Sequence, residues 1–114
     1  MTATTRLAEF VVKTSLRDCP DAVLTQTRRA VLDSIGVMLA GAAEPVATSV
    51  RAVARAEGGV RLCTVLGTSM RTAQGWAALA NGAAGHAHDF DDTNFALMGH
   101  PSVPIVDVAC QPRV

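Results

Sequence analysis

An all-α fold is predicted by three features of this 114-residue sequence. Hydrophobic residues make up 49% of the chain but aromatic residues only 4%, so the apolar content is mainly Ala, Val and Leu. Alanine is the best helix former, whereas the aromatic strand formers are scarce. Apolar residues recur at helical spacing through most of the chain, and a single segment alternates as a strand would. We therefore expect about five helices with one short extended segment.

The first two predicted helices precede Gly41. Residues 4–17 place Leu7, Phe10 and Val11 on one face of an amphipathic helix. A second pattern follows Pro20 and runs from Asp21 to about Ala40, where Gly41 is a reasonable helix stop. Gly36 lies inside this second helix at a cost of roughly 1 kcal/mol relative to Ala. We interpret Gly36 as a point where a neighbouring backbone packs closely.

A third helix and the extended segment follow. Glu44-Pro45 begins the helix, since Pro is tolerated in a first turn, and Gly58-Gly59 ends it. Residues 60–66 alternate in polarity and form the strand candidate, which needs a partner or is an extended connector. The residues expected to face inward are Val46, Val50 and Val53 in the helix, and Val60, Leu62, Thr64 and Leu66 in the strand.

The last two predicted helices carry the least charge. Residues 69–87 contain many Gly and Ala and no ionisable side chain between Arg71 and His86, which predicts a helix buried on several sides. His100-Pro101-Ser102 is typical of a helix start, and the buried side after it is expected to be Val103, Ile105, Val106, Val108 and Ala109. These apolar surfaces need neighbours, so we expect residues 1–114 to be an incomplete helical domain, with no second domain.

Charge and cysteine content limit the classes of function. Lys+Arg and Asp+Glu are both 10, and no basic run occurs, so the sequence predicts no nucleic-acid partner. The longest apolar run, residues 35–43, is too short to span a bilayer, so no membrane partner is expected. Cys19, Cys63 and Cys110 are far apart and odd in number, which favours reduced thiols in a cytoplasmic protein.

The candidate site lies in residues 81–102, which contain all three histidines of the chain. If the preceding helix continues through Thr93, then His86, Asp89 and Thr93 share one face, while Asp91 and Asp92 point away. His100 follows after a short loop, and the helix start at Ser102 would offer free backbone N–H groups to a carboxylate. This arrangement favours proton transfer next to a substrate carboxylate, with Thr93, His86 and Ser102 as binding residues.

Other interpretations of the same segment remain open. Each residue, taken singly, fits a structural role: His86 as a core histidine, and Asp91 and Asp92 as solvated turn residues. His88 lies off the predicted face and is interpreted as incidental. A metal site is not expected, because His86 and His88 are not four residues apart on a helix. Residues 89–93 match the DxDxT string of haloacid-dehalogenase-like phosphatases, but no hydrophobic strand precedes them.

These residues resemble the N-terminal signature of the MmgE/PrpD family, which includes 2-methylcitrate dehydratase, cis-aconitate decarboxylase and iminodisuccinate epimerase. The resemblance is carried by Asn81-Gly82, by residues 86–93 (HAHDFDDT) and by residues 100–102 (HPS), and more loosely by the whole chain. It implies a large helical domain with a smaller α/β lid, usually in a homodimer, and chemistry that needs no cofactor. It also implies that Asp89, Thr93 and His100 line the active site, with His86 preceding them, and that the loop 94–99 shapes substrate choice.

Two hypotheses about function follow. Family members are several hundred residues long, and the resemblance implies that a lysine, further histidines and a tyrosine complete their sites. The only lysine here is Lys13, in the first helix, and the ending 109–114 breaks the apolar helical pattern. The first hypothesis is therefore a truncated lyase or isomerase acting on small di- or tricarboxylates, inactive alone, with His100 and Asp89 as its catalytic residues. The second is a helical interaction module that packs on a partner or on a full-length relative, with a homo-oligomer expected.

Overall fold

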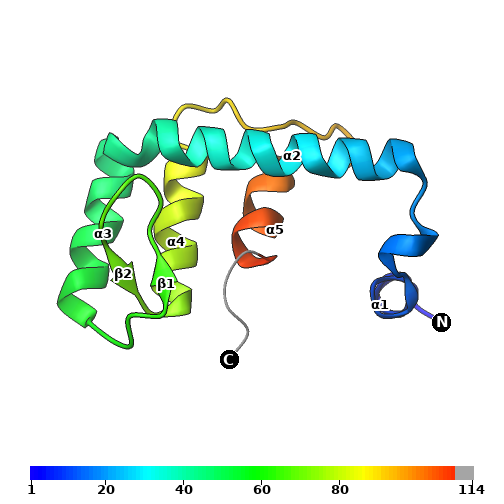
Figure 1. The fold of residues 1–114 in the computed structure, drawn as a ribbon, viewed down its shortest axis with the longest axis horizontal. Coiled ribbons are helices and arrows are strands. Elements are labelled where there is room, and N and C mark those ends of the chain that lie inside the picture. The colour runs from blue at the N-terminus through cyan, green and yellow to red at the C-terminus, as the bar shows by residue number, and fades with distance from the viewer. Residues whose placement is uncertain (110–114) are drawn as a thin grey trace.

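The computed structural model describes residues 1–109, which form five α-helices and two short strands (Figure 1). This confirms the predicted all-α architecture. The predictions about Cys110 and about the terminal residues 110–114 lie outside the described residues. In chain order the elements are α1 (Ala3–Lys13), α2 (Asp21–Ala40), α3 (Pro45–Glu57), β1 (Cys63–Thr64), β2 (Arg71–Thr72), α4 (Gln74–Gly85) and α5 (Ser102–Ala109).

Helix α2 is the longest helix and is the axis of the layer that it forms with α3, α4 and α5. It begins directly after Pro20 and ends at Gly41, as the sequence predicts. Helices α4 and α5 both pack against α2 and against each other, and α3 packs against α4. In Figure 1, α3, α4 and α5 all descend from the same side of α2, with α4 between the other two. The buried α4 therefore lies in the middle of this layer and contacts α3 on one side and α5 on the other.

A glycine permits the close approach of α2 to α4, but it is Gly41 and not Gly36. A Cβ atom at Gly41 would lie 2.0 Å from the carbonyl oxygen of Ala84, so no larger residue fits without a shift. A Cβ atom at Gly36 would meet nothing within 4 Å, and Gly36 is exposed. The prediction that Gly36 serves close packing is therefore wrong, because α2 presents that position to solvent.

The extended segment has a partner immediately downstream. Cys63 pairs with Thr72 and Thr64 with Arg71 in an antiparallel two-stranded sheet, and the amide of Val65 donates to the carbonyl of Met70 at 3.0 Å. Since residues 71–72 are used in this sheet, α4 begins at Gln74 rather than at the predicted residue 69. Cys19 and Cys63 are both free thiols.

Small side chains form most of the core. The buried side of α4 consists of Ala77, Ala80, Asn81, Ala84 and Gly85, which confirms the predicted buried helix. Helix α3 faces this surface with Ala47 and Ala54, while Val46 and Val53 are about half exposed, contrary to prediction. Close contact between two helices leaves room only for alanine along the line of contact.

The predicted buried faces of the extended segment and of α5 also differ from those in the structure. In the extended segment Cys63 and Val65 are buried, whereas Val60, Leu62 and Thr64 are exposed. Alternate residues of a strand lie on opposite faces, so only one of the two sets can pack on α4. The set that packs there is Cys63 and Val65, which contact Ala77 and Ala80. In α5, the predicted Val103 and Val106 are buried together with Asp107, but Ile105 and Val108 are exposed.

Asn81 ties the sheet segment and α5 to α4 through one buried amide. Its Oδ1 accepts from the amide of Leu66 at 2.9 Å. Its Nδ2 donates to the carbonyl of Thr64 and to the carboxylate of Asp107, both at 3.2 Å. A buried amide whose donors and acceptor are all used fixes the relative placement of the three segments.

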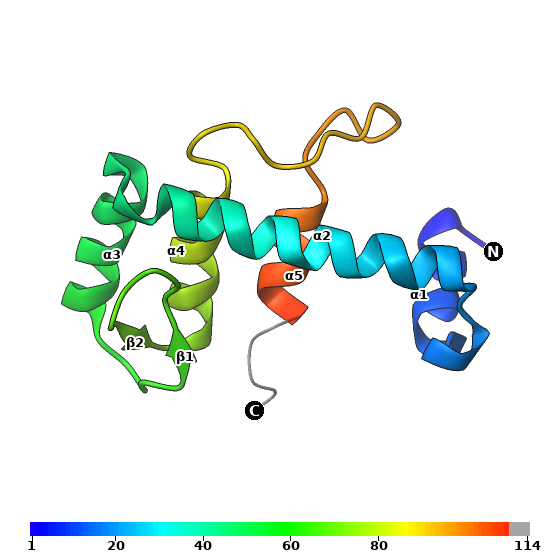
Figure 2. The same cartoon turned by 45° about the horizontal axis from the view of Figure 1, so that its top comes forward.

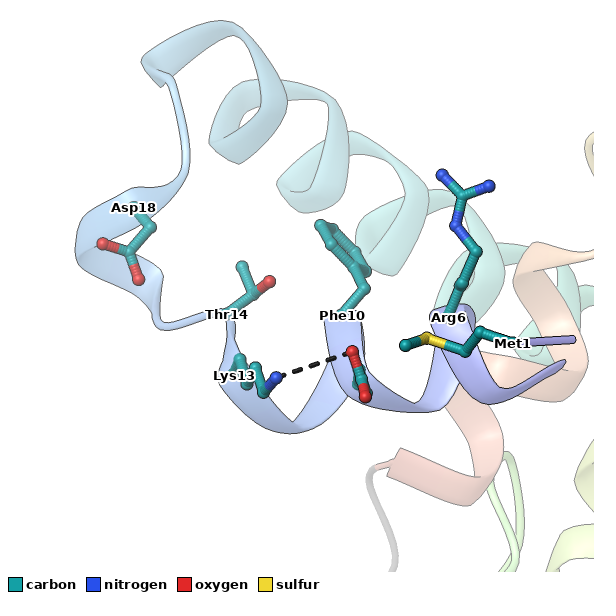
Figure 3. Close-up of a pocket in the computed structure, with 7 residues that line it drawn as sticks. Met1, Arg6, Phe10, Lys13, Thr14 and Asp18 are labelled. Carbon is teal, nitrogen blue, oxygen red and sulfur yellow. Dashed lines mark ion pairs between the residues drawn. The ribbon is translucent and has the colours of Figure 1, made fainter. Parts of the chain in front are cut away.

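Helix α1 lies apart from the helical layer, beside the N-terminal end of α2 (Figures 1 and 2). It ends at Lys13 rather than at the predicted residue 17, and a short 3-10 turn, Leu16–Asp18, follows. No residue of α1 is buried, and Leu7, Phe10 and Val11 are each more than 60% exposed. Figure 3 shows the open hollow beside it, lined by Met1, Arg6, Glu9, Phe10, Lys13, Thr14 and Asp18.

Among residues 1–109, no single helix is long and apolar enough to cross a bilayer. The segments 21–43 and 45–57 reach the required length and composition only when taken together, and they are bent by 82° at their junction.

Candidate functional site

The chain leaves the helical path at the start of the candidate site. Helix α4 ends at Gly85, His86 is its C-cap, and Asp89 has φ +57° in the left-handed region. A residue in that conformation cannot be part of a continuing helix. The predicted continuation of the helix through Thr93 is therefore wrong, and the common face of His86, Asp89 and Thr93 does not form. The site is built instead by the loop that joins α4 to α5.

Asp91 is the centre of the site, although it was predicted to point away from it. Its side chain is only 2% exposed, and its carboxylate oxygens lie 3.0 and 3.2 Å from the Nδ1 of His86. The hydrogen bond from His86 to Asp91, the charge of Asp91 and, more weakly, the charge of Asp89 raise the pKa of His86 above its ordinary value. Protonated His86 is therefore stabilised next to a buried carboxylate.

His100 comes to the same place from the other end of the loop. Its Nδ1 donates to the carbonyl oxygen of Asp91 at 3.2 Å, and its Nε2 lies 3.4 Å from Oδ1 of Asp89. The rings of His86 and His100 are 4.8 Å apart between centroids, at an interplanar angle of 60°. The structure thus brings together His86, Asp89 and His100, all predicted for the site, but through the loop rather than through a helix face.

Ser102 and Asp92 form a pair that the sequence did not predict. The carboxylate of Asp92 accepts from the amide of Ser102 at 3.0 Å and from its hydroxyl at 2.6 Å. Asp92, predicted to be a bystander, is thereby the cap of α5. The amide of Ser102, which was expected to be free for a substrate carboxylate, is already bound within the chain.

Thr93 and His88 lie outside the cluster. Thr93 is exposed, and within residues 1–109 its hydroxyl has no hydrogen-bond partner. His88 forms an ion pair with Glu44 at 3.6 Å and stacks on Phe90 at 5.5 Å between ring centroids. The incidental role of His88 stays a prediction.

The cluster lines a small hollow at the junction of α4, the loop and α5. The cavity has a volume of about 250 Å³, and its lining residues are Gly82, His86, Asp91, His100, Val103 and Pro104. Because a carbonyl oxygen can only accept, Nδ1 of His100 carries the hydrogen, which leaves Nε2 for proton exchange. Asp89, whose side chain is 76% exposed, lies beside that nitrogen as a second proton acceptor.

The same four side chains offer metal ligands. One ligand atom from each of His86, Asp89, Asp91 and His100 lies within 4.8 Å of the others. The sequence argument against a metal site considered only His86 and His88 on a helix, whereas the folded loop pairs His86 with His100. Gly85, directly before His86, was the signal that could have predicted the helix end and, with it, the roles of Asp91 and Asp92.

The fold and the site define an all-α protein with a paired imidazole and carboxylate cluster at the end of its buried helix. The chain belongs to the MmgE/PrpD family: residues 5–109 match the MmgE/PrpD N-terminal domain. This match confirms the resemblance carried by the residues around His86 and His100. No curated protein and no solved structure gives a significant match to the chain.

Proposed function

We propose that this chain supplies part of the acid and base site of a cofactor-independent lyase or isomerase that acts on small di- or tricarboxylates, of the 2-methylcitrate dehydratase type. Membership of the MmgE/PrpD family supports the reaction class. The observation that carries the proposal is the contact of 3.4 Å between Nε2 of His100 and the carboxylate of Asp89. Two groups that can each take or give a proton thus lie side by side, and His100 also lines the hollow.

In this proposal His100 and Asp89 are the catalytic residues and His86 binds substrate. The carbonyl of Asp91 fixes the tautomer of His100, so that Nε2 is the exchanging nitrogen. The raised pKa of His86 favours its imidazolium form, which attracts a substrate carboxylate. Thr93 is exposed and lies outside the cluster, and we propose that it adds a hydroxyl donor from the loop when substrate binds. Ser102 holds Asp92 in this structure, so its proposed contact with substrate requires release of that pair.

We propose further that the chain alone binds such carboxylates but does not turn them over. Asp89 is 76% exposed and His86 58% exposed, so water competes with the substrate for both groups. The only lysine, Lys13, lies in α1, which is separate from the helical layer (Figure 1). Purified chain incubated with 2-methylcitrate or cis-aconitate should show no turnover above the buffer blank.

Binding is tested by nuclear magnetic resonance of the three histidine rings. Titration with 2-methylcitrate should shift the ring signals of His100 and His86, while the signal of His88, paired with Glu44, serves as an internal control. His100→Ala should remove the response of His86 to the ligand. Equal shifts at all three rings, or none, would exclude this site. If the wild-type chain does turn over substrate and His100→Ala abolishes that activity, the proposed inactivity is wrong but the proposed site is supported.

A second candidate function is that of a helical interaction module, supported by the apolar surface. Twenty large hydrophobic side chains within residues 1–109 are exposed, among them Phe10, Leu32, Phe95 and Ile105. The radius of gyration is 15.5 Å, compared with about 13 Å for a compact domain of this length. Sedimentation velocity should therefore show a homo-oligomer at micromolar concentration. A monomer at every concentration would leave this candidate without support.

A further inference from the structure

The site cluster has the composition and spacing of a transition-metal site. In a tetrahedral site with bonds of about 2.0–2.2 Å, neighbouring ligand atoms are about 3.4 Å apart. His86 Nδ1 lies 3.0 Å from Asp91 Oδ1, and His100 Nε2, the nitrogen that carries no hydrogen, lies 3.4 Å from Asp89 Oδ1. The four residues as a set have ligand atoms within 4.8 Å of one another. Closing this set around one ion requires movements of about an ångström.

We propose that His86, Asp89, Asp91 and His100 bind one Zn²⁺ ion, and that the bound ion blocks the site by occupying the groups that would otherwise exchange protons. The binding stands on the geometry alone. The block rests on the proposed function, because it concerns the same imidazoles and the same carboxylate.

The burial of the four side chains suits a site that an ion can enter and close. Asp91 is 2% exposed and anchored between both histidines, so it provides a fixed ligand at the base of the site. Asp89 and His86 are 76% and 58% exposed, so their side chains can rotate towards an ion that arrives from solvent. The fixed ligand sets the position, and the exposed ligands allow the adjustment in distance.

The ligand types select the class of metal. Two imidazoles and two carboxylates suit zinc and its neighbours among the divalent first-row ions. Mg²⁺ and Ca²⁺ prefer ligand sets made only of oxygen atoms, so neither should compete at this cluster. Any block of the site would therefore follow exposure to zinc and not to the abundant hard cations.

Zinc binding is tested on the full chain after treatment with EDTA. Isothermal titration should show one equivalent of Zn²⁺ bound and no heat of binding with Mg²⁺. His86→Ala and His100→Ala should each weaken the zinc affinity at least tenfold, because each removes a direct ligand. His88→Ala is the matched control: it removes the third histidine of the chain, two residues from His86 and paired with Glu44, and should leave the affinity unchanged.

Folding of each variant is checked by circular dichroism, and Asp89→Asn provides a second test at an exposed position. Zinc affinity that is equal in wild type, His100→Ala and Asp89→Asn would overturn the site. Loss of affinity in His88→Ala alone would also overturn it. If zinc binds as expected, one equivalent should suppress the shift that 2-methylcitrate causes at His100. A shift that persists with zinc bound would overturn the block, and the absence of any shift without zinc would count against the proposed function instead.

Discussion

The carboxylate of Asp91 is shielded from water and faces the Nδ1 of His86, while its backbone carbonyl accepts from His100. One residue therefore holds both imidazoles of the cluster. A buried carboxylate requires compensation for lost hydration, and here the hydrogen bond from His86 provides it, with the ring of His100 also within 3.5 Å.

Replacing Asp91 by Asn should lower the pKa of His86 towards its ordinary value of 6.5, since the hydrogen bond and the charge of Asp91 are the main causes of its rise. In wild type the raised pKa stabilises the fold fully below pH 6.5, and this contribution is lost as the pH rises through the raised value. Histidine-selective resonance titration of EDTA-treated protein measures the change. An unchanged pKa at His86 would contradict the pairing.

The histidine cluster could be predicted from the sequence in its membership, but not in its geometry. His86, Asp89 and His100 were found because titratable residues gather in a short segment. Asp91 and Asp92 were misplaced because a helix was extended through Gly85, and helical geometry then turns both away. Gly85 itself is needed because Val103 and Met38 pack closely on it, and an added Cβ would lie 2.6 Å from Val103. Such a contact joins distant parts of the chain and has no local sequence pattern.

At the scale of the elements, two glycines of the same segment should respond in opposite directions to alanine. Gly41→Ala should destabilise the fold by about 1–3 kcal/mol, because the new Cβ would meet the carbonyl of Ala84. Gly36→Ala should stabilise it by about 1 kcal/mol, since that position is exposed inside α2 and has open space around it. Urea unfolding followed by circular dichroism measures both. Equal effects of the two substitutions would contradict the close packing of α2 on α4.

The cap of α5 gives a second prediction at this scale. Asp92→Ala removes the acceptor for the amide and the hydroxyl of Ser102 and should cost about 1 kcal/mol of stability. Asp92→Asn keeps one oxygen acceptor and should recover most of that loss. Urea unfolding of the two variants compares them, and a stability of Asp92→Ala equal to that of wild type would show that Ser102 is not capped by this residue.

The positions of the helices could be predicted from apolar periodicity, but which elements pack or pair with one another could not. The bounds of α2 and α3 agree with the pattern of apolar residues and with the Pro and Gly signals at their ends. The first turn predicted for α4 became β2, because Arg71 and Thr72 satisfy the backbone groups of β1. Strand pairing competes with helix propensity here, and only the tertiary arrangement decides between them.

For the whole molecule, the exposed apolar surface predicts how the isolated chain behaves. Helix α1 buries nothing, and α3 and α5 each expose valine or isoleucine side chains. Unless copies associate, a hydrophobic dye should bind and become fluorescent, and thermal unfolding should be broad. Dye fluorescence and calorimetry at low protein concentration test this. A monomer that melts sharply and binds no dye would show that the exposed surface needs no cover.

The loop between Asp91 and His100 is closed at its base by a pair of backbone hydrogen bonds, from Asn94 to Gly99 at 2.9 Å and back at 3.3 Å. Beyond this closure the chain turns on the side chain of Asn94 and presents Phe95, Leu97 and Met98 to solvent. We expect the tip to tolerate changes in length and sequence, because the Asn94–Gly99 pair separates it from the histidines. In the function proposed above, residues 95–98 could therefore change substrate choice without any change in His86, Asp89 or His100.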